Sequence, residues 1–395
     1  MSARAVFGES RMPQQTKRIA INFGGGYVPG LNAVIAGTVR ASSELGWEAF
    51  GIQDGYDGLL FPDRYPDGGL VRLTPGDLHE LAGSHGCLLG AAPRSDPFRV
   101  RTIVDGQVEE IDRSDDVLAG LAQAGIDGVV SVVGARSMSI LFRLHRKGLK
   151  TVCVPKSVHN DVAATMLSFG FNSALSFVTE MLQRCREAAR STHRIAVVEV
   201  TGEQAGWLAL QSAIAVCADA VLIPEIRYDL DAVAAKLCAK ARAGDTSGLV
   251  VVAEGARPVT AQEASVAPSA PKLKAMLSPG ATGGEGFHVI DRSGQASAHV
   301  ALELQRRTDQ EMYPLVLGEL ARAGSPTALD RQLGLGYGAG AVRALEREQH
   351  GMMVVFQPPD LKFVPLAEAI NKVRTVPPES ALLVIARSLG ISLGE

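Results

Sequence analysis

Short apolar segments that alternate with longer helical ones constrain the fold of this chain more than any other feature of its sequence. The apolar segments have the length and the Val- and Ile-rich composition of strands buried on both faces. Amphipathic spacing predicts helices at 31–45, 173–191 and 230–244. Strands that alternate with helices indicate βαβ units and parallel sheets, and therefore an α/β fold. The predicted strands are 18–23, 128–134, 151–155, 194–200, 220–225 and 248–255.

Length, charge and cysteine content narrow the class of protein. A chain of 395 residues favours two domains, and a net charge of −3 gives no general attraction to nucleic acid or to an anionic membrane. The five cysteines form no CxxC pair, which argues against a disulfide framework or a zinc site, and Cys153 and Cys217 lie in apolar runs typical of core residues. With no uninterrupted apolar 18-mer and no signal peptide, we expect a soluble, cytoplasmic protein.

The C-terminal half contains one irregular segment. Residues 257–286 are rich in Ala, Pro, Ser and Gly, which predicts a surface loop; Lys272 and Lys274 could make it a basic lid. After it, GMMVVF predicts a strand, and PLAEAINKVR and ALLVIARSLG predict two helices.

Two loops lie where the chemistry of such a fold is expected, beyond the carboxyl ends of strands. The first, GGGYVPG (24–30), lets the backbone approach a ligand and precedes a helix whose N-terminal N–H groups suit a phosphate. It lacks the GK[ST] of a Walker A loop and fits GxG but not GxGxxG. A purely structural turn, or the nicotinamide site of an oxidoreductase, is the alternative interpretation. The second loop, PKSVHND (155–161), places Lys, Ser, His and Asp within a few positions.

Several segments occur in an order that resembles one family. They include GGGYVPGLNAVI, GIQDGYDGLL, PKSVHND, RIAVVEVTGEQAGWLAL, ADAVLIPE, VVAEGA and LGELARAGSPTALDR. Together they resemble the phosphofructokinases, over roughly residues 18–394. PKSVHND is similar to the PKTIDND of the pyrophosphate-using members, and the terminal ISLGE resembles the tails of that branch.

The resemblance implies a fold and an activity. It implies two doubly wound, Rossmann-like domains, one formed by about 1–170 with 321–365 and the other by 171–320 with 366–395. The family transfers a phosphoryl group from ATP or pyrophosphate to a hydroxyl of fructose 6-phosphate, with Mg²⁺. A neighbouring subunit contributes residues, which implies a homodimer or homotetramer.

Matched position by position, the resemblance implies site residues. Gly25, Gly134, Arg136 and Lys156 would bind the donor phosphates, and Ser157, His159 and Asp161 would lie at the reacting centre. The acceptor would meet residues from several later segments. These are Ser157, Arg194, Thr201, Gly202, Glu203, Glu225, Tyr313, Glu319 and Arg322.

The chain departs from the family at positions that carry its chemistry. His159 replaces the catalytic-base aspartate, and Ala135, followed by Arg136, replaces the aspartate that holds Mg²⁺. A histidine can accept a proton, but neighbouring phosphates would raise its pKa and weaken it as a base. Glu203 and Glu319 place acids where the family binds the sugar phosphate, which would repel a phosphate.

Two functions remain open at this point. One is a phosphotransferase that uses pyrophosphate or ATP, with an altered sugar or sugar-phosphate acceptor. The other is a catalytically impaired homologue that binds a phosphorylated ligand or acts as a regulatory subunit.

Overall fold

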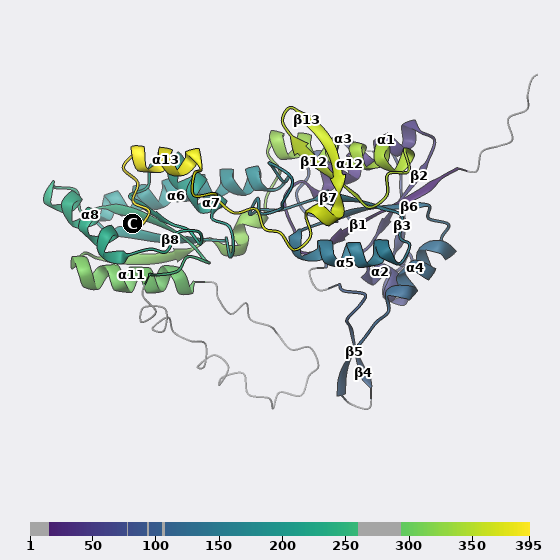
Figure 1. Ribbon diagram of the computed structural model, residues 1–395, viewed down its shortest axis with the longest axis horizontal. Coiled ribbons are helices and arrows are strands. Elements are labelled where there is room, and N and C mark those ends of the chain that lie inside the picture. Colours follow the sequence, from purple (N-terminus) through teal and green to yellow (C-terminus); the bar gives the residue numbers. More distant parts are fainter. Residues whose placement is uncertain (1–15, 77, 93–94, 105–106, 260–293) are drawn as a thin grey trace, which may run out of the picture.

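A computed structural model describes residues 16–76, 78–92, 95–104, 107–259 and 294–395, and shows two α/β halves side by side (Figure 1). Most of the segment 257–286, with Lys272 and Lys274, lies outside the described residues. We call the part built on the seven-stranded sheet the large-sheet half, and the part built on the four-stranded sheet the small-sheet half. The prediction of an α/β fold with parallel sheets is confirmed.

The large sheet has seven strands in the order β13-β12-β7-β6-β1-β2-β3. Its central strands are parallel, and antiparallel β3 and β13 close its two edges. The strands are β1 (Arg18–Gly24), β2 (Glu48–Ile52), β3 (Leu70–Leu73), β6 (Gly128–Val133), β7 (Thr151–Pro155), β12 (Met352–Gln357) and β13 (Asp360–Pro365).

The small sheet has four strands, all parallel, in the order β11-β8-β10-β9. They are β8 (Ile195–Val200), β9 (Ala220–Leu222), β10 (Gly248–Ala253) and β11 (Met312–Val316). A separate antiparallel hairpin, β4 (Val100–Val104) with β5 (Gln107–Ile111), completes the strands of the described residues.

Helices cover both faces of each sheet because the strands are apolar on both sides. In β1, Ile19 and Ile21 pack in a core cluster on one face, whereas Ala20 packs in a cluster on the other face. The first of these clusters continues into the small-sheet half, so the two halves share one apolar core. The helices are α1 (Leu31–Glu44), α2 (Asp57–Leu60), α3 (Leu78–Gly83), α4 (Ser114–Gln123), α5 (Ala135–Arg146), α6 (Phe171–Thr192), α7 (Trp207–Ala215), α8 (Leu230–Arg242), α11 (Gln295–Thr308), α12 (Ala328–Glu346) and α13 (Ala381–Ser388).

The chain passes between the halves more than once. The large sheet takes strands from residues 18–155 and 352–365, and the small sheet takes strands from 195–316. The C-terminal segment returns to the small-sheet half, where Ser392 bridges Ala220. Domain boundaries at 170, 320 and 365 remain a prediction.

Two details of the sequence analysis are wrong. PLAEAINKVR forms a short 3₁₀ turn, η3 (Leu366–Glu368), rather than a helix, because Asn371 adopts a left-handed φ of 55° and Val373 pairs with Val162. Cys217 is exposed in a turn, although Cys153 is buried as expected and the cysteines are free.

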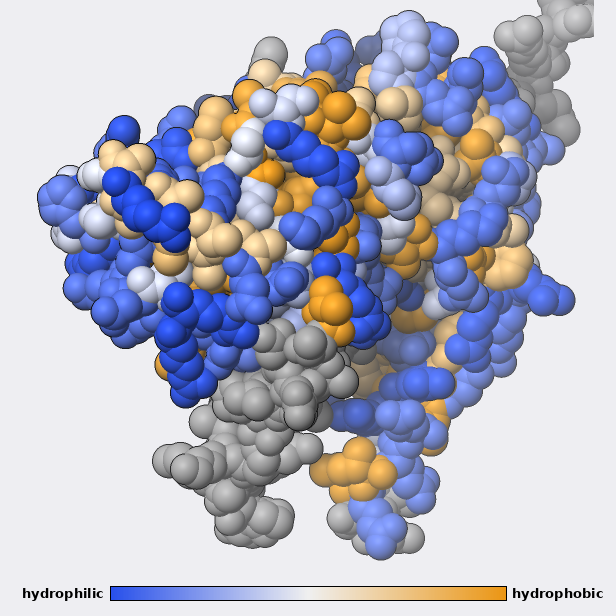
Figure 2. All heavy atoms as spheres, turned by 60° about the vertical axis from the view of Figure 1, so that its left-hand side comes forward, coloured by the Kyte–Doolittle hydropathy of each residue, from blue (hydrophilic) through white to orange (hydrophobic). Residues whose placement is uncertain are grey.

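The β4–β5 hairpin was not expected from the sequence. The β4–β5 hairpin stands away from the body (Figure 1), and Figure 2 shows apolar atoms on it at the lower edge of the molecule. Its cross-strand pair Ile103 and Val108 is 71% and 67% exposed.

Among the described residues, no helix is long and apolar enough to cross a membrane.

Glycines let helices α1 and α12 approach each other closely. A Cβ atom at Gly37 of α1 would lie 2.2 Å from the carbonyl oxygen of Leu335, and one at Gly338 of α12 would lie 2.4 Å from that of Val34. Real side chains do not fit at these separations, so backbone packs directly on backbone. Residues of both helices share one apolar cluster with Ile19 and Ile21 of β1, the strand that leads into the glycine turn.

We expect Gly37→Ala to lower the free energy of unfolding by about 2–3 kcal/mol, because the added methyl group forces the two helices apart. Urea unfolding measures the change. Gly120→Ala in α4 is the matched control, since its Cβ would meet Leu59 at an ordinary 3.6 Å. The control should be neutral or stabilising by up to about 1 kcal/mol. Equal effects of the two substitutions would contradict the close packing.

Candidate active site

Three loops lie side by side at the carboxyl edge of the large sheet. They follow β1, β6 and β7, which are neighbours in the sheet. The loops are the glycine turn 24–30, the segment 134–136 at the start of α5, and the loop 156–161. The sequence predicted that the first and third of these carry the chemistry, and the sheet order brings them together.

Lys156 is buried at the centre of these loops, with only 2% of its surface exposed. Its Nζ donates to the carbonyl oxygen of Gly26 at 2.5 Å and lies 3.4 Å from that of Gly25. Burial is the main cause that lowers its pKa to about 7. The positive charge of nearby Arg322 adds to this lowering, whereas Cys87 opposes it. In the described part of the chain Lys156 forms no ion pair with an acid, so its charge is not neutralised by the protein.

The glycine turn is shaped to present these carbonyl groups. Gly25 has φ 82°, which few residues other than glycine adopt, and a Cβ atom there would lie 3.2 Å from Ser137 Oγ. Tyr27, the next residue but one, accepts a hydrogen bond from the backbone N–H of Gly86 through its hydroxyl oxygen at 2.9 Å. Burial raises the pKa of Tyr27, so the hydroxyl stays protonated. The turn is therefore tied to the loop around Gly86.

The loop after Lys156 is held by its own side chains. Ser157 Oγ donates to Asp161 Oδ1 at 2.6 Å and accepts from the backbone N–H of His159 at 2.9 Å. Asn160 has a left-handed φ of 54°, and its Oδ1 accepts from the N–H of Ser168 at 3.0 Å. The hydroxyl of Ser157 is thus engaged in shaping the loop and in holding Asp161.

His159 meets an arginine from the small-sheet half. Its Nε2 lies 3.1 Å from Nη2 of Arg322, which ends η2 (Gly318–Arg322). A guanidinium can only donate, so Nε2 accepts and the imidazole is neutral, with its proton on Nδ1. Burial lowers the pKa of His159 to about 4, assisted by Arg322 and Arg136 and opposed by Asp161. Burial and two arginines cause this lowering in the protein alone, and the raised pKa expected beside phosphates stays a prediction.

Arg136 and Glu203 form an ion pair across the two halves. Arg136 lies in the first turn of α5, and Glu203 follows β8 of the small sheet. Both are exposed enough for solvent to screen the pair, so it adds little to stability. The pair matters for the chemistry of the site, because the guanidinium of Arg136 partly neutralises the carboxylate of Glu203. The family resemblance implies neither of these two charges.

Glu319 also has a cationic partner. Its Oε2 lies 2.7 Å from Nε of Arg322, within the same turn. The expectation that Glu203 and Glu319 would repel a phosphate is weakened by these pairs, because each carboxylate is partly neutralised by an arginine that also faces the cleft.

Glu225 has a structural role that the sequence analysis did not foresee. Its carboxylate accepts from the backbone N–H of Gly206 at 2.9 Å and of Val376 at 2.8 Å. Gly206 is the residue before α7, so Glu225 caps that helix at its positive end. Both hydrogen bonds leave less of the carboxylate available for a sugar hydroxyl.

Thr201 and Gly202 lie at the carboxyl end of β8, as predicted. Gly202 has no room for a side chain, since a Cβ atom would lie 2.9 Å from the carbonyl oxygen of Ala205. Thr201 Oγ1 lies 3.4 Å from Glu254 Oε1. Burial raises the pKa of Glu254, with Glu199 and Glu203 adding to the effect.

Arg194 and Tyr313 lie away from the other candidates within one chain. They stand at the amino ends of the parallel strands β8 and β11, whereas Glu203 and Glu319 follow the carboxyl ends. Six residues of strand separate the two edges by about 20 Å. Arg194 instead stacks over the ring of Tyr313 at 5.0 Å and pairs with Glu311 at 3.2 Å.

The donor atoms near residue 135 do not fit a protein-bound Mg²⁺. Ala135 offers no side-chain oxygen, Arg136 adds a positive charge beside it, and Asp161 is held by Ser157. Within the described ranges, no cluster of three His, Cys, Asp or Glu residues could hold a metal ion. The cations Lys156, Arg136 and Arg322 occupy the region instead.

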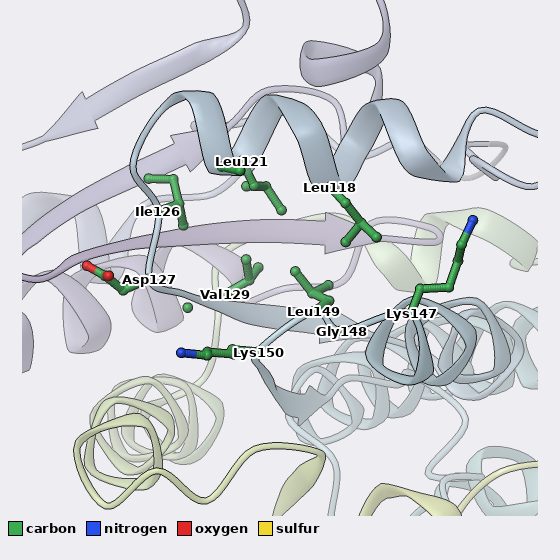
Figure 3. Close-up of a pocket in the computed structure, with 11 residues that line it drawn as sticks. Leu118, Leu121, Ile126, Asp127, Val129, Lys147, Gly148, Leu149 and Lys150 are labelled. Atoms are coloured by element: carbon green, nitrogen blue, oxygen red, sulfur yellow. The ribbon is translucent and has the colours of Figure 1, made fainter.

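Two pockets lie elsewhere on the large-sheet half. One of about 290 Å³ opens at the amino ends of β6 and β7, where Asp127 and Lys150 flank leucines of α4 (Figure 3). Another, of about 380 Å³, is lined by Ile35, Leu78 and Leu89 among others. Neither is lined by the loops described above, whose candidate residues lie where the two halves meet.

The sequence analysis missed two residues that hold the cleft together. Arg374 Nη1 donates to the carbonyl oxygen of Asn160 at 3.2 Å, and its guanidinium carbon lies 4.1 Å from the centroid of the Trp207 ring. Trp207 was visible as one of two tryptophans, directly after Gly206. No sequence signal pointed to Arg374, because it lies in a segment predicted to be helical.

The fold and the cleft define a two-lobed α/β protein of the doubly wound class. The family model described as phosphofructokinase matches residues 18–345. An ATP-dependent 6-phosphofructokinase of Chloroflexus aurantiacus is 36% identical over 384 residues, 97% of this chain and 99% of the relative. A pyrophosphate–fructose 6-phosphate 1-phosphotransferase of Amycolatopsis mediterranei is 34% identical over 363 residues, 92% and 97% of the two chains.

A solved structure supports the same fold. The pyrophosphate-dependent phosphofructokinase from Marinobacter aquaeolei superposes with a TM-score of 0.72 over 95% of this chain and 92% of that chain, at 16% identity. This chain belongs to the phosphofructokinase family.

We expect Lys156→Met to raise the free energy of unfolding at pH 7 by about 2 kcal/mol, the order found when buried charges give way to apolar groups. The folded-state pKa of about 7 lies below the unfolded value, so the wild type gains stability as pH rises from 7 towards 10.5. The advantage of methionine should therefore shrink over that interval.

Urea unfolding at pH 6, 7 and 10 measures this dependence. Lys147→Met is the matched control, because Lys147 is a partly exposed lysine paired with Asp115. A Lys156→Met protein that is less stable than the wild type by the same amount at all three values would contradict a destabilised buried ammonium.

Proposed function

We propose that this chain is a pyrophosphate-dependent phosphotransferase that acts on a hydroxyl of a sugar phosphate. The observation that carries the proposal is the buried ammonium of Lys156, which faces glycine-turn carbonyls and has no acidic partner among the described residues. A compact, doubly charged phosphate would supply the missing negative charge.

The identity of residue 156 favours pyrophosphate over ATP. In the family resemblance, a lysine at this position marks the pyrophosphate users and takes space that a nucleotide needs. Among eight curated relatives, seven are named as ATP-dependent and one for pyrophosphate, so their names do not support pyrophosphate as the donor. The donor assignment therefore rests on Lys156.

Three cations and one helix end converge on the place of the donor. Lys156 and Arg322 lie within the range of mutual electrostatic influence, and Arg136 lies in the first turn of α5. The free N–H groups of that turn add the positive end of the helix dipole. Phosphoryl transfer depends mainly on positioning and on charge stabilisation, and these groups supply both without a metal ligand at 135.

His159 is the candidate proton acceptor, with Arg322 controlling its availability. Binding of a phosphate draws Arg322 towards the new anion and exposes the lone pair of Nε2. The acceptor hydroxyl then gives its proton to Nε2 while its oxygen bonds to the transferred phosphorus. The bond from that phosphorus to the bridging oxygen breaks, and the second phosphate leaves with the electron pair. The nearby phosphates would raise the pKa of His159 from about 4 towards neutrality, which makes the neutral imidazole a stronger base. The weakening expected from the sequence applies to a histidine that starts from the ordinary pKa of 6.5 and becomes fully protonated.

The acceptor we favour is a phosphorylated sugar such as fructose 6-phosphate. Altered acceptor chemistry was inferred from the acids at 203 and 319, but each is paired with an arginine. Displacing an arginine from its carboxylate towards a phosphate leaves the overall charge of the cleft suitable for an anionic sugar.

A catalytically impaired, phosphate-binding homologue is the second candidate. The specific observation in its favour is the bond between Arg322 and His159 Nε2, which occupies the lone pair that catalysis needs. Binding of pyrophosphate without transfer to any sugar phosphate would support this function and exclude the first.

The proposed function is tested by measuring phosphoryl transfer to fructose 6-phosphate, with pyrophosphate or ATP as the donor. ³¹P NMR monitors the reaction. We expect turnover with pyrophosphate and at least tenfold less with ATP. His159→Asn should lower kcat by about a hundredfold or more, the usual loss for a general base. The matched control, His193→Asn, changes an exposed histidine at the end of α6 and should leave kcat unchanged. Full activity of His159→Asn would contradict the proton-transfer role.

A further inference from the structure

The segment 371–377 crosses the cleft between the two halves, along the yellow trace that precedes α13 in Figure 1. It runs antiparallel to the end of the His159 loop. Val373 bridges Val162, and the N–H of Arg374 donates to the carbonyl oxygen of Asp161 at 2.8 Å. The backbone of Asp161 is therefore fixed from the C-terminal segment.

The side chain of Arg374 contacts both halves at once. Nη1 donates to the carbonyl oxygen of Asn160 in the loop at 3.2 Å, and the guanidinium stacks on the ring of Trp207, the first residue of α7. Trp207 returns the contact, since its Nε1 donates to the carbonyl oxygen of Arg374 at 2.8 Å. One residue thus joins the carboxyl edge of the large sheet to the start of a helix in the small-sheet half.

The electrostatics of Arg374 are unusual for a structural arginine. It is half-buried and forms no ion pair with an acid of the described residues. Burial lowers its pKa, because partial loss of solvent disfavours the charged form. The carbonyl group of Asn160 and the ring of Trp207 are the contacts that favour the charged guanidinium.

The same segment also orients a carboxylate of the acceptor side. Two residues after Arg374, the N–H of Val376 donates to Glu225 Oε1 at 2.8 Å, and the same carboxylate caps α7 through Gly206. Asp161, Trp207 and Glu225 are therefore tied to one short stretch of chain.

We propose that Arg374 is a positioning residue that sets the His159–Asp161 loop against the α7 end of the cleft, so that both halves respond together to a bound phosphate. The carbonyl group that it holds belongs to Asn160, between His159 and Asp161, whose left-handed backbone fixes the direction of both neighbouring side chains. This inference rests on the proposed function for its effect on transfer. Its effect on the coupling between loop and Trp207 is independent of transfer.

We expect substitutions of Arg374 to lower kcat and to leave the KM for pyrophosphate almost unchanged. The donor cations Lys156 and Arg136 lie outside the contacts of Arg374, so the KM for pyrophosphate should change by no more than about twofold. Misplacing the proton acceptor relative to the acceptor sugar should lower kcat about tenfold in Arg374→Met. In Arg374→Lys, which keeps the charge but loses the planar stacking group, kcat should fall about threefold.

The experiment uses the full chain in a Trp47→Phe background, which leaves Trp207 as the single tryptophan. Its emission is recorded during titration with pyrophosphate, and kcat and KM are measured on the same samples at a temperature at which circular dichroism shows each variant folded. Arg387→Met is the matched control, because Arg387 lies in α13 and pairs with Glu395 away from the loop.

The expected result is a change in Trp207 emission on adding pyrophosphate, lost in Arg374→Met and kept in Arg387→Met, together with the tenfold fall in kcat. If Arg374→Met does not fold, the same emission response and kcat are measured on the milder Arg374→Lys variant.

An unchanged emission response and an unchanged kcat in a folded Arg374 variant would overturn the inference while the proposed function stands. No emission change on pyrophosphate binding in the Trp47→Phe parent would overturn it as well. Loss of the response in a protein that binds pyrophosphate but shows no transfer would sustain the coupling and overturn the proposed function.

Discussion

A buried ammonium held by backbone carbonyl groups governs the arrangement of the cleft. Lys156 donates to the glycine turn, and this contact joins the loop after β7 to the loop after β1 across the edge of the large sheet. The carbonyl groups hold the amine in place but do not neutralise its charge, and burial keeps the charged form unfavourable. An anion that binds beside such an ammonium would stabilise it, and this is the physical basis of the proposed phosphate-binding role.

The two halves meet at this centre through a few polar contacts above a shared apolar core. Arg322 bonds His159, Arg136 pairs with Glu203, and Arg374 stacks on Trp207. Two of these contacts use residues at which the sequence resemblance implies a departure from the family. The charges at 136 and 203 compensate each other in this structure. If both are departures, they exchange partners within one electrostatic network rather than act as independent losses.

The sequence predicted the strands and the two loops because buried parallel strands are short, apolar and followed by glycine or polar residues. It placed Lys156, Ser157, His159 and Asp161 in one loop, and the structure brings Gly25, Arg136, Glu203 and Arg322 close to them. It could not show that Val376 donates to the Glu225 carboxylate, or that Arg374 reaches the His159 loop, because both depend on contacts between segments about 150 residues or more apart. Tertiary pairing of Val373 with Val162 also overrode the helical pattern of 365–374.

The most direct measurement is the pKa of Lys156 itself, followed by NMR on protein with isotope-labelled lysine, in the absence and presence of pyrophosphate. A buried and unpaired ammonium predicts a pKa of about 7 in the protein alone, and a rise of more than one unit once pyrophosphate supplies the opposite charge. A pKa near the ordinary 10.5 that does not move with pyrophosphate would contradict the central role of this lysine.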